Sequence, residues 1–538
     1  MEKIDKSKRL YQTFWAMQDQ EALKGKQIYF DSVAEMLLVR SREFPDRVHV
    51  YYYDEVVTYA QTNERSNKVA NYLKAKGVQK GDIVSIMILN SPDVHYTMFG
   101  AQKLGAIAGM VNYMLMPPEI AYVLDDSKPK VVFVGNNFMP VFAKGYALAE
   151  HKPIVVEVAT GDTNDASLAE TTLAGILAEY PSDEALVHQS PSDPYLLLYS
   201  SGTTGQPKGV LLSNRGQFAI NRACGYGNLM TADEIMYNPA PMFHVTSLCL
   251  YTYMSLFYGF GLVIRKTFSP TDWWPTVMKY GVTNCWCTPA MYMYLMYKVD
   301  PATIDRDKVK LRFPNAGGSA VPMELFCEFE TRFGITLVDG YGLTECNGWA
   351  LSTYKLPIKE GSLGHALPGC ELEILDESNN ILPYGEKGEI CIRGEMVMIG
   401  YLNKPEATAD ALRGGWLHTG DLGWMDEQGY VYFAGRTKEM INRGGENIYP
   451  REIEIPLEAH PKIVEVAVIG VPDPDLGERA KACIVLAPGE TMTGQEVKDY
   501  LKESIAKYKI PEIVQFYDSL PHSATGKVNK LELKKSSS

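Results

Sequence analysis

The sequence predicts an α/β protein with a large layered amino-terminal domain and a small α+β carboxy-terminal domain. Three observations lead to this prediction. The chain has 538 residues, too many for one simple hydrophobic core. Helix-like and strand-like segments alternate through most of it, as in layered α/β architecture. Past about residue 435 this alternation gives way to strand-like segments separated by a turn-rich stretch and followed by an amphipathic helix.

The alternation is clearest early in the chain. Residues 64–78 have apolar side chains at helical spacing, and GDIVSIMI, which begins at residue 81, is typical of a buried strand. KPKVVFVG and GVTNCWCTPA predict further buried strands. YLLLY (Tyr195–Tyr199) and GVLLS (Gly209–Ser213) predict two strands on either side of a glycine-rich loop.

The carboxy-terminal segments predict a second, smaller unit. IVEVAVIGV and AKACIVLA are expected strands, and GQEVKDYLKESIAKYK (residues 494–509) is an expected helix that ends just before a proline. We therefore expect domains at residues 1–434 and 435–538, joined near GRTKEM (Gly435–Met440).

One segment raises the question of a membrane span. Residues 247–264, SLCLYTYMSLFYGFGLVI, carry no charge and are just long enough. Their Tyr, Thr and Ser residues and the Gly-Phe-Gly near their end favour a buried helix followed by a short strand. The first residues hold no apolar run of signal-peptide length, and the final KKSSS is not a peroxisomal Ser-Lys-Leu signal. A cytoplasmic location is expected.

Composition narrows the function classes. The net charge of −13 argues against binding to nucleic acid or to an anionic membrane, because both require a basic face. Anionic small ligands stay possible, since local lysines and backbone amides bind them. The nine cysteines form no framework, and the Cys285/Cys287 pair has no nearby His or Cys cluster, which favours reduced core cysteines over a metal site.

The loop YSSGTTGQPKGV (Tyr199–Val210) has the composition of a phosphate-binding loop. A Walker loop would require Gly in place of Pro207 and Ser or Thr in place of Gly209, and it would lead into a helix. The interpretation that remains is an anion-binding loop built from glycines, hydroxyls, free amides and the cation of Lys208. The alternative is an ordinary surface hairpin turn.

The loop closely resembles the signature loop of the adenylate-forming superfamily, which includes acyl-CoA synthetases, luciferases and peptide-synthetase adenylation domains. The other motifs of that family follow in its order: PMFH (241–244), NAGGSAVP (315–322), DGYGLTE (339–345), GSLGHALPG (361–369), GWLHTGDLG (415–423), GRTKEMINRGGENIYPREIE (435–454) and ATGKVNK (524–530). The resemblance implies an ATP-dependent carboxylate–CoA ligase, which forms an acyl-adenylate and pyrophosphate and then an acyl-CoA thioester. It implies Mg²⁺ as cofactor and ATP and CoA as co-substrates.

The resemblance also implies roles for single residues around ATP. Thr344 would contact the α-phosphate, and Glu345 would hold Mg²⁺, a hard cation that prefers carboxylate oxygens. Asp421 would accept the two ribose hydroxyls, with Arg436 in support. The β- and γ-phosphates would be held by Ser200, Ser201, Gly202, Thr203, Thr204, Gly205 and Lys208. Adenine would lie among Gly317, Gly318, Ser319, Asp339, Gly340, Tyr341 and Gly342.

The carboxy-terminal domain carries the remaining implied machinery. Lys527 would bridge the substrate carboxylate and the α-phosphate, positioning the attack and neutralising developing charge. In this family the domain rotates about a hinge between the two half-reactions, and the hinge position corresponds to Lys438. After rotation a CoA channel would be lined by Arg443, Gly444, Gly445 and Glu446.

The same resemblance places an acyl pocket around His244, Val245, Ser247, Leu248, Trp286, Gly348 and Trp349. No charged residue stands among them, and an amino-acid ammonium group would require a carboxylate. The Asp that follows the Phe of this motif in amino-acid adenylation domains is absent here. If the two tryptophans face the pocket, they favour medium-chain, alicyclic or aromatic acids over long chains. One departure from the family is Asn214, where a histidine is common.

Three alternatives remain open at this point. An acyl-AMP ligase that loads a carrier protein shares these motifs, although the insertion that such proteins often carry is not obvious. A luciferase-like monooxygenase also shares them. A non-catalytic ATP or acyl-AMP sensor is disfavoured by intact Glu345, Asp421, Arg436 and Lys527. The sequence leaves the oligomeric state open.

Overall fold

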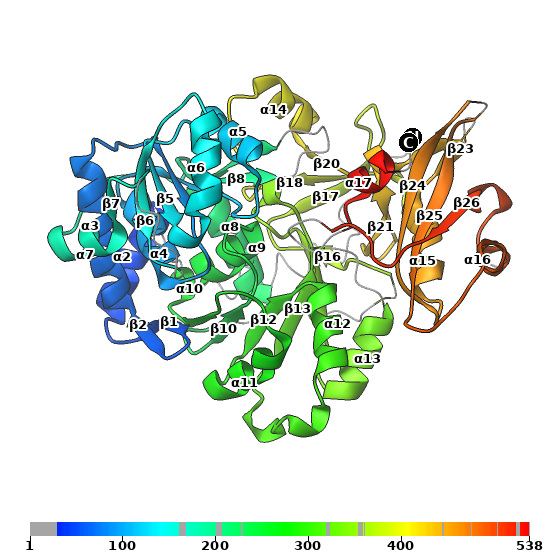
Figure 1. Cartoon of the computed structure of the whole chain (residues 1–538), viewed down its shortest axis with the longest axis horizontal. Helices are drawn as coiled ribbons and strands as arrows, with labels where there is room; N and C mark the ends of the chain where they lie inside the picture. The colour runs from blue at the N-terminus through cyan, green and yellow to red at the C-terminus, as the bar shows by residue number, and fades with distance from the viewer. Residues whose placement is uncertain are drawn as a thin grey trace.

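A computed structural model describes residues 30–160, 168–200, 207–227, 230–318, 323–352, 359, 361–443, 446–474, 476–502, 504–522 and 528–536. The described residues form four sheets (Figure 1). Two large sheets flanked by helices make up most of the molecule. A four-stranded sheet lies between them and a carboxy-terminal unit that holds the fourth sheet. This mixed α/β architecture, with a large amino-terminal part and a small carboxy-terminal part, confirms the predicted fold class.

The first sheet has eight strands in the order β19-β9-β8-β4-β3-β5-β6-β7. The pairs from β8 to β7 are parallel, and β9 and β19 add two antiparallel pairings at one edge. Its strands are β3 (Ile83–Met87), β4 (Ile107–Met110), β5 (Val131–Gly135), β6 (Ile154–Val158), β7 (Thr171–Thr172), β8 (Pro194–Ser200), β9 (Lys208–Ser213) and β19 (Gly400–Tyr401). The helices of this part of the chain are α2 (Val33–Glu43), α3 (Tyr59–Ala75), α4 (Pro92–Lys103), α5 (Pro117–Ser127), α6 (Met139–Leu148) and α7 (Leu173–Glu179).

Local sequence explains the predicted helix and strand here. Thr58 and Gln61 form a capping box that starts α3, and Gly77, with φ of 76°, follows its end. All five residues of β3 are buried, as expected for a central strand of a parallel sheet. The predictions for residues 64–78 and for GDIVSIMI are therefore confirmed.

The second sheet has nine strands in the order β16-β15-β14-β13-β12-β10-β11-β1-β2. Its strands are β1 (Val48–Tyr52), β2 (Glu55–Thr58), β10 (Ile235–Asn238), β11 (Gly261–Ile264), β12 (Asn284–Cys287), β13 (Phe313–Gly317), β14 (Val338–Tyr341), β15 (Leu351–Ser352) and β16 (His365–Ala366). Its helices are α8 (Asn214–Gly227), α9 (Val245–Ser247), α10 (Tyr253–Tyr258), α11 (Pro270–Tyr280), α12 (Pro289–Lys298) and α13 (Met323–Phe333).

The uncharged segment 247–264 is buried, as predicted. A π-helical turn over Leu248–Thr252 leads into α10, Gly259 ends that helix with φ of 81°, and β11 follows. Leu248 and Tyr253 are completely buried. Within the described residues, no helix is both long enough and apolar enough to cross a bilayer.

The third sheet has the order β17-β18-β20-β21 and is antiparallel throughout. It consists of β17 (Glu371–Leu375), β18 (Gly388–Arg393), β20 (Leu417–Met425) and β21 (Val431–Arg436), and α14 (Pro405–Ala411) precedes β20. The last sheet pairs β23-β22-β25-β24, with β26 beside β25. Its strands are β22 (Ile441–Arg443), β23 (Glu446–Ile448), β24 (Ile463–Asp473), β25 (Gly477–Leu486) and β26 (Ile513–Phe516).

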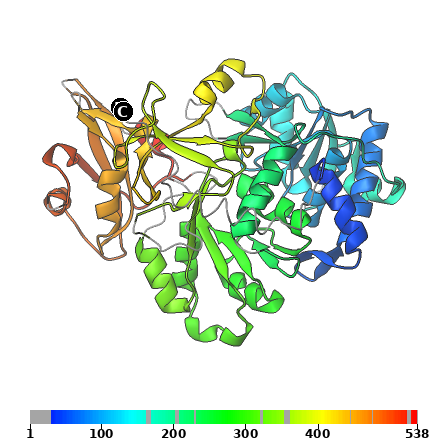
Figure 2. The same ribbon diagram turned by 180° about the vertical axis from the view of Figure 1, so that it is seen from behind.

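The carboxy-terminal unit packs beside the third sheet, as the views from both sides show (Figures 1 and 2). Its helices are α15 (Pro450–Glu458), α16 (Gly494–Leu501) and α17 (Lys530–Lys535). Lys387, just before β18, reaches Glu452 of α15 with an Nζ–Oε1 distance of 2.7 Å. The unit also has its own apolar core around Ile453, Val468 and Leu501.

One predicted element is wrong in extent. The sequence predicts a helix over residues 494–509, but α16 ends at Leu501 and residues 507–509 form a separate 3₁₀ turn. Ala506 is extended, with φ of −62° and ψ of 144°. Ile505 and Ile510 on either side of it both pack against the carboxy-terminal core. The chain therefore ends the helix early, and these two side chains gain contact with the core.

Candidate functional site

The glycine-rich loop connects two antiparallel strands. Ser200 at the end of β8 faces Lys208 at the start of β9 across the ladder. This strand–loop–strand setting is the predicted one, and it excludes a Walker loop, which would enter a helix. The predicted phosphate-binding residues Ser201, Gly202, Thr203, Thr204 and Gly205 lie outside the described residues. Only the two ends of the loop are therefore placed, at one edge of the first sheet.

Lys208 and Glu345 are brought together by Tyr401 of β19. The Lys208 Nζ lies 4.8 Å from the centre of the Tyr401 ring, and the Tyr401 hydroxyl donates to Glu345 Oε1 at 3.0 Å. Burial raises the pKa of Glu345, while the Tyr401 hydrogen bond and the charges of Arg436 and Lys208 oppose that rise. A carboxylate next to the cation at the end of the glycine-rich loop has the chemistry that a Mg²⁺–phosphate complex requires.

Asp421 is held between two groups. Tyr341 donates its hydroxyl proton to Asp421 Oδ2 at 2.7 Å, and Arg436 Nε lies 3.1 Å from Asp421 Oδ1. Asp421 and Arg436 are direct partners on β20 and β21, while Tyr341 comes from β14 in the second sheet. The carboxylate of Asp421 is thus fixed in place where the second and third sheets meet.

Glycines in adjacent strands make room for two tryptophans. Gly317 of β13 pairs with Gly340 of β14. A Cβ on Gly317 would lie 3.2 Å from Trp286 Nε1, and one on Gly340 would lie only 1.7 Å from Trp349 Nε1. Gly318, with φ of 84°, lies against the same Trp286 indole. The glycines predicted to line an adenine slot are therefore also required for indole packing.

Gly342 and Thr344 follow on the same segment. A Cβ on Gly342 would lie 2.2 Å from the Gly348 carbonyl oxygen, so the chain folds tightly back on itself here. Thr344 and Glu345 form a short 3₁₀ turn directly after it. Ser319, the last predicted member of the adenine slot, lies outside the described residues.

Asp339 lies at the base of the DGYGLTE segment. Its side chain is buried, and its Oδ1 accepts a hydrogen bond from the Gly340 amide at 2.7 Å. Burial raises the pKa of Asp339 to about 7, although the Gly340 hydrogen bond opposes that rise. The group therefore changes its protonation state near neutral pH.

Strand β12 divides its side chains between two environments, as the alternation of a strand requires. Cys285 and Cys287 face a core that also contains Trp273 and Tyr292. Asn284 and Trp286 face the other way and line a small cavity together with Trp349. The position of the two cysteines in an apolar core agrees with their interpretation as core residues.

The predicted acyl-pocket residues surround this cavity only in part. His244 stacks on Trp286 with ring centroids 6.3 Å apart, and Gly348 lies against Val245. Trp286 and Trp349 both line the cavity. Ser247 and Leu248 are fully buried and are not part of its lining.

Sequence reasoning missed most of the cavity wall. The residues that complete it are Met230, Met236, Leu250, Tyr251, Met254, Asn284 and Asn315. Leu250 and Tyr251 lie in the π-helical turn, whose irregular geometry no simple periodicity reveals. The signal for Asn284 and Asn315 was the presence of an amide in two otherwise apolar buried strands.

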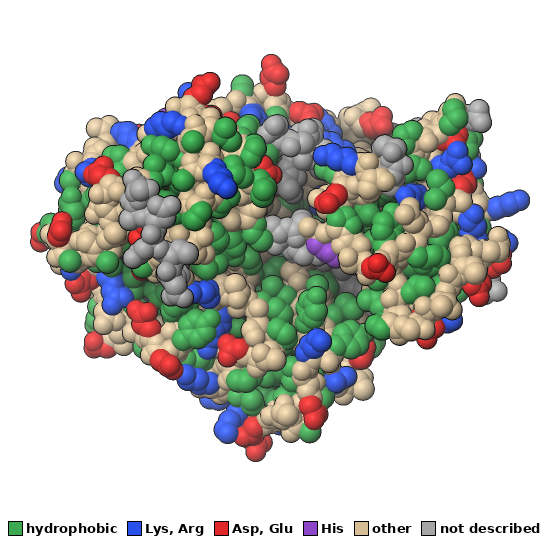
Figure 3. Space-filling model, viewed as in Figure 1, with side chains coloured by type: hydrophobic (Ala, Val, Ile, Leu, Met, Phe, Trp, Pro, Cys, Tyr) green, Lys and Arg blue, Asp and Glu red, His purple; other side chains and the backbone are tan. Residues whose placement is uncertain are grey.

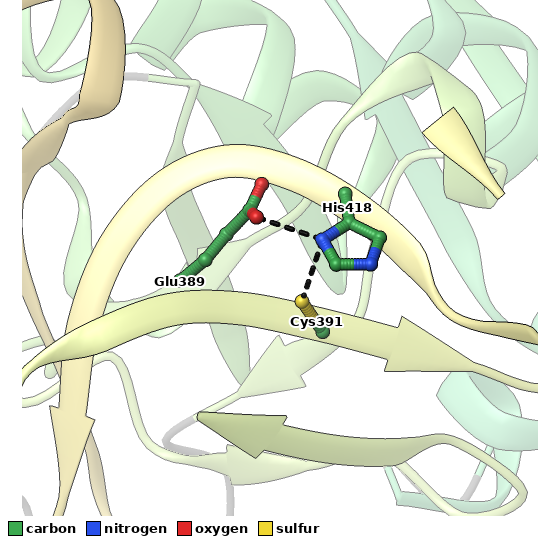
Figure 4. Close-up of side chains that lie close together, drawn as sticks. All are labelled: Glu389, Cys391 and His418. Carbon is green, nitrogen blue, oxygen red and sulfur yellow. Dashed lines mark hydrogen bonds and ion pairs between the residues drawn. The ribbon is translucent and has the colours of Figure 1, made fainter. Parts of the chain in front are cut away.

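A second cluster, which the sequence did not suggest, lies in the third sheet (Figure 4). Glu389 Oε2 is 2.7 Å from His418 Nδ1, and Cys391 Sγ is 3.4 Å from the same nitrogen. These are possible metal ligands, but Arg413 also pairs with Glu389, at 3.1 Å. The other oxygen of Glu389 accepts from the Gly420 amide at 2.8 Å, so the cluster supports the backbone next to Asp421.

The carboxy-terminal candidates are placed only in part. Lys438 lies in a 3₁₀ turn between β21 and β22, and Arg443 pairs with Glu512. Gly444, Gly445 and Lys527 lie outside the described residues, and Glu446 is described only as part of strand β23. The hinge, the CoA channel and the catalytic lysine therefore stay predictions.

Asn214, the departure from the family, has a structural role. It is completely buried, its Oδ1 accepts from the Val33 amide at 2.9 Å, and its Nδ2 donates to the Asp193 carbonyl at 3.3 Å. It joins the start of α2 to the hairpin of β8 and β9.

The surface is hollowed near the centre of the face shown in Figure 3. Hydrophobic side chains gather below the hollow, and acidic and basic side chains are scattered over the rest of this face without forming a basic patch. The absence of a basic patch on this face agrees with the net charge of −13.

Comparisons with known proteins show which family this chain belongs to. The family model described as "AMP-binding enzyme" matches residues 38–402, and "AMP-binding enzyme C-terminal domain" matches residues 452–527. The chain is 34% identical to the long-chain-fatty-acid–CoA ligase FadD13 of Mycobacterium tuberculosis, over 89% of this chain and 93% of that protein. It is 33% identical to the fatty acid–[acyl-carrier-protein] ligase ScoC of Streptomyces coeruleorubidus, over 89% of this chain and 91% of that protein.

The fold is similar to solved structures as well. One is the anthranilate CoA ligase AuaEII in complex with anthranoyl-AMP, with a TM-score of 0.86 and 26% identity. The match covers 95% of this chain and 98% of that one.

Proposed function

This chain belongs to the AMP-binding enzyme family of the adenylate-forming superfamily, and from this premise we propose that it is an ATP-dependent carboxylate–CoA ligase acting on a medium-chain, alicyclic or aromatic acid. The observation that carries the proposal is the convergence of Lys208 of β9, Glu345 of the turn after β14 and Asp421 of β20, through Tyr401 and Tyr341. These groups supply a cation, a metal-binding carboxylate and a diol acceptor in one region.

In this proposal the phosphates of ATP lie against the loop that ends at Lys208. Glu345 would hold Mg²⁺, which supplies positive charge to the phosphate oxygens. Asp421, already oriented by Tyr341 and Arg436, accepts the ribose hydroxyls without reorganising. Preorganised acceptors of this kind lower the cost of binding because their orientation is fixed before ATP arrives.

The carboxylate of the acid attacks the α-phosphorus, and the P–O bond to the leaving pyrophosphate breaks. Lys527 would hold the attacking carboxylate beside the α-phosphate. After rotation about Lys438, the thiol of CoA attacks the acyl carbon, forming the thioester and releasing AMP. The rotation, Lys438 as hinge and the channel at residues 443–446 are parts of this proposal. A cytoplasmic location likewise stays a prediction.

The test is pyrophosphate release with ATP, Mg²⁺ and a panel of carboxylic acids, with and without CoA. The panel runs from acetate to palmitate and includes benzoate, cyclohexanecarboxylate and several amino acids. We expect CoA-dependent turnover with medium-chain, alicyclic or aromatic acids. Glu345→Gln is expected to lower kcat/KM for ATP by at least about 100-fold, because the group that binds the metal loses its charge. No pyrophosphate release with any acid would contradict the proposal.

A second candidate is a ligase that transfers the acyl group to a carrier protein. This candidate is supported by the 33% identity to ScoC, which is named as a fatty acid–[acyl-carrier-protein] ligase. The same assay separates the two, because a carrier-loading enzyme forms acyl-adenylate but no acyl-CoA when CoA is added.

A further inference from the structure

The cavity beside Trp286 and Trp349 contains polar groups that an apolar acid would not use. Asn284, Asn315 and Tyr251 all line it and are 1%, 3% and 2% exposed. Most of the remaining wall consists of methionine, leucine and tryptophan side chains. Placing amides in such a wall is costly unless they are hydrogen-bonded.

The hydrogen bonds among these three side chains do not use every polar atom of the cavity wall. Asn315 Nδ2 donates to Asn284 Oδ1 at 3.0 Å, and the Asn315 side chain is also hydrogen-bonded to the Tyr251 hydroxyl. The Asn284 Nδ2 is buried and has no partner among the described residues. Swapping the amide oxygen and nitrogen of Asn284 alone would break its bond to Asn315 Nδ2, whereas swapping both amides together would keep the bond and reverse its direction. With the amides as the structure orients them, the cavity wall presents a buried N–H donor without an acceptor among the described residues.

The cavity lies where the far end of an acid substrate would lie. Its two tryptophans pack directly against the Gly317–Gly340 pair, and Gly340 leads through Tyr341 to Glu345. A carboxylate reacting with ATP beside Glu345 and Lys208 leaves the rest of the acid to extend toward the indoles. The cavity itself measures about 10 Å³, room for about one water-sized group.

None of the described residues that line the cavity is charged, so a charged substituent would have no counter-ion among them. A neutral oxygen atom of the substrate could accept a hydrogen bond from Asn284 Nδ2 and would fit the small volume of the cavity. An alkyl chain that continued into the cavity would need more room and would leave the Asn284 amide without a hydrogen bond.

Resting on the proposed function, we propose that the substrate is an aromatic or alicyclic acid with a neutral oxygen at the end distant from its carboxyl group, and that Asn284 donates a hydrogen bond to this oxygen. The oxygen belongs to a hydroxyl, keto or ether group. Asn315 acts as a positioning residue, because its bond to Asn284 Oδ1 directs the Nδ2 group into the cavity.

The test uses acids matched in shape, such as 4-hydroxybenzoate with 4-methylbenzoate, 4-hydroxycinnamate with 4-methylcinnamate, and 4-oxocyclohexanecarboxylate with 4-methylcyclohexanecarboxylate. For the pair of the length that fits, we expect kcat/KM to favour the oxygen-bearing acid by at least about 10-fold. In Asn284→Leu this preference should fall to about one or reverse. Met236→Leu, in the same wall, is the matched control and should keep it.

A second variant and a binding measurement test the same preference independently. Asn284→Ser retains a donor and should keep part of the preference if Asn284→Leu fails to fold. The same acid pairs, titrated by the fluorescence of the native tryptophans with ATP absent, give binding ratios that do not depend on turnover. A preference near one for every pair, or one that Asn284→Leu leaves unchanged, would overturn the inference. Absence of pyrophosphate with every acid, alongside a clear binding preference, would instead overturn only the proposed function.

Discussion

At the scale of single residues, Asp339 combines a buried position with a pKa near neutrality. Its pKa rises from 3.8 to about 7 because burial disfavours the charged carboxylate. Folding therefore favours the protonated form, and the stability that protonation contributes is fully present below pH 3.8 and is lost as pH rises through about 7.

We expect Asp339→Asn to remove this dependence. Between pH 4 and pH 7 the free energy of unfolding of the wild type, relative to the variant, should fall by up to about 4 kcal/mol. Denaturant unfolding of both proteins without ATP across this range measures it. A constant difference between the two would show that Asp339 is ionised throughout.

Gly340 gives a second prediction at this scale. A methyl group there would overlap the Trp349 indole, whose Nε1 would lie 1.7 Å from the new Cβ. Gly340→Ala should therefore cost about 2–4 kcal/mol of stability, and adding Trp349→Leu should recover part of the loss. Gly175→Ala, whose Cβ would meet nothing closer than 3.4 Å, is the control and should be nearly neutral. Equal melting temperatures for Gly340→Ala and the control would contradict the packing described.

At the scale of elements, α17 is anchored to the predicted hinge by one lysine. Lys530 Nζ lies 2.7 Å from Glu439 Oε2 and 2.8 Å from Glu454 Oε1. Burial lowers the pKa of Lys530, but these two carboxylates more than reverse this, and its pKa is raised. The cation therefore joins α17 to the turn that contains Lys438 and to α15.

Replacing this cation should loosen the carboxy-terminal unit. Lys530→Met removes the cation shared by Glu439 and Glu454 and leaves Glu454 with Arg451 at 3.4 Å, a loss that we expect to cost about 3 kcal/mol. Hydrogen exchange should then increase in α15 and α17 but not in the first sheet. Lys535→Met, at an exposed position of the same helix, should leave the exchange unchanged. Uniform protection in both variants would show that Lys530 does not hold these elements together.

The elements also show what could be predicted from sequence. Helix α10 and strand β11 follow from an uncharged run that ends in glycines, and β3 follows from the apolar run GDIVSIMI, whereas the π-helical turn does not follow from the sequence. The end of α16 at Leu501 does not follow, because Ile505 and Ile510 reach the core through a turn that helical periodicity does not encode. Likewise, the motifs identify Asp421, but they do not show that Tyr341 and Arg436 orient it from different strands.

At the scale of the whole molecule, the candidate site depends on long-range assembly. Tyr401, which joins Lys208 to Glu345, lies 56 positions from Glu345 in the chain. Asn284 and Asn315, from adjacent parallel strands, face one cavity because the strands pair in register. Local sequence specifies the motifs, while the order of strands in the sheets brings them together.

We propose that this chain joins an acid to AMP before it joins the acid to CoA. The most direct measurement is a single turnover with excess enzyme, ATP, Mg²⁺ and an accepted acid, quenched and analysed by mass spectrometry before and after CoA is added. We expect acyl-adenylate bound to the protein without CoA, and its conversion to acyl-CoA and AMP when CoA is added. Formation of ADP and phosphate, or of acyl-CoA with no adenylate preceding it, would contradict the account.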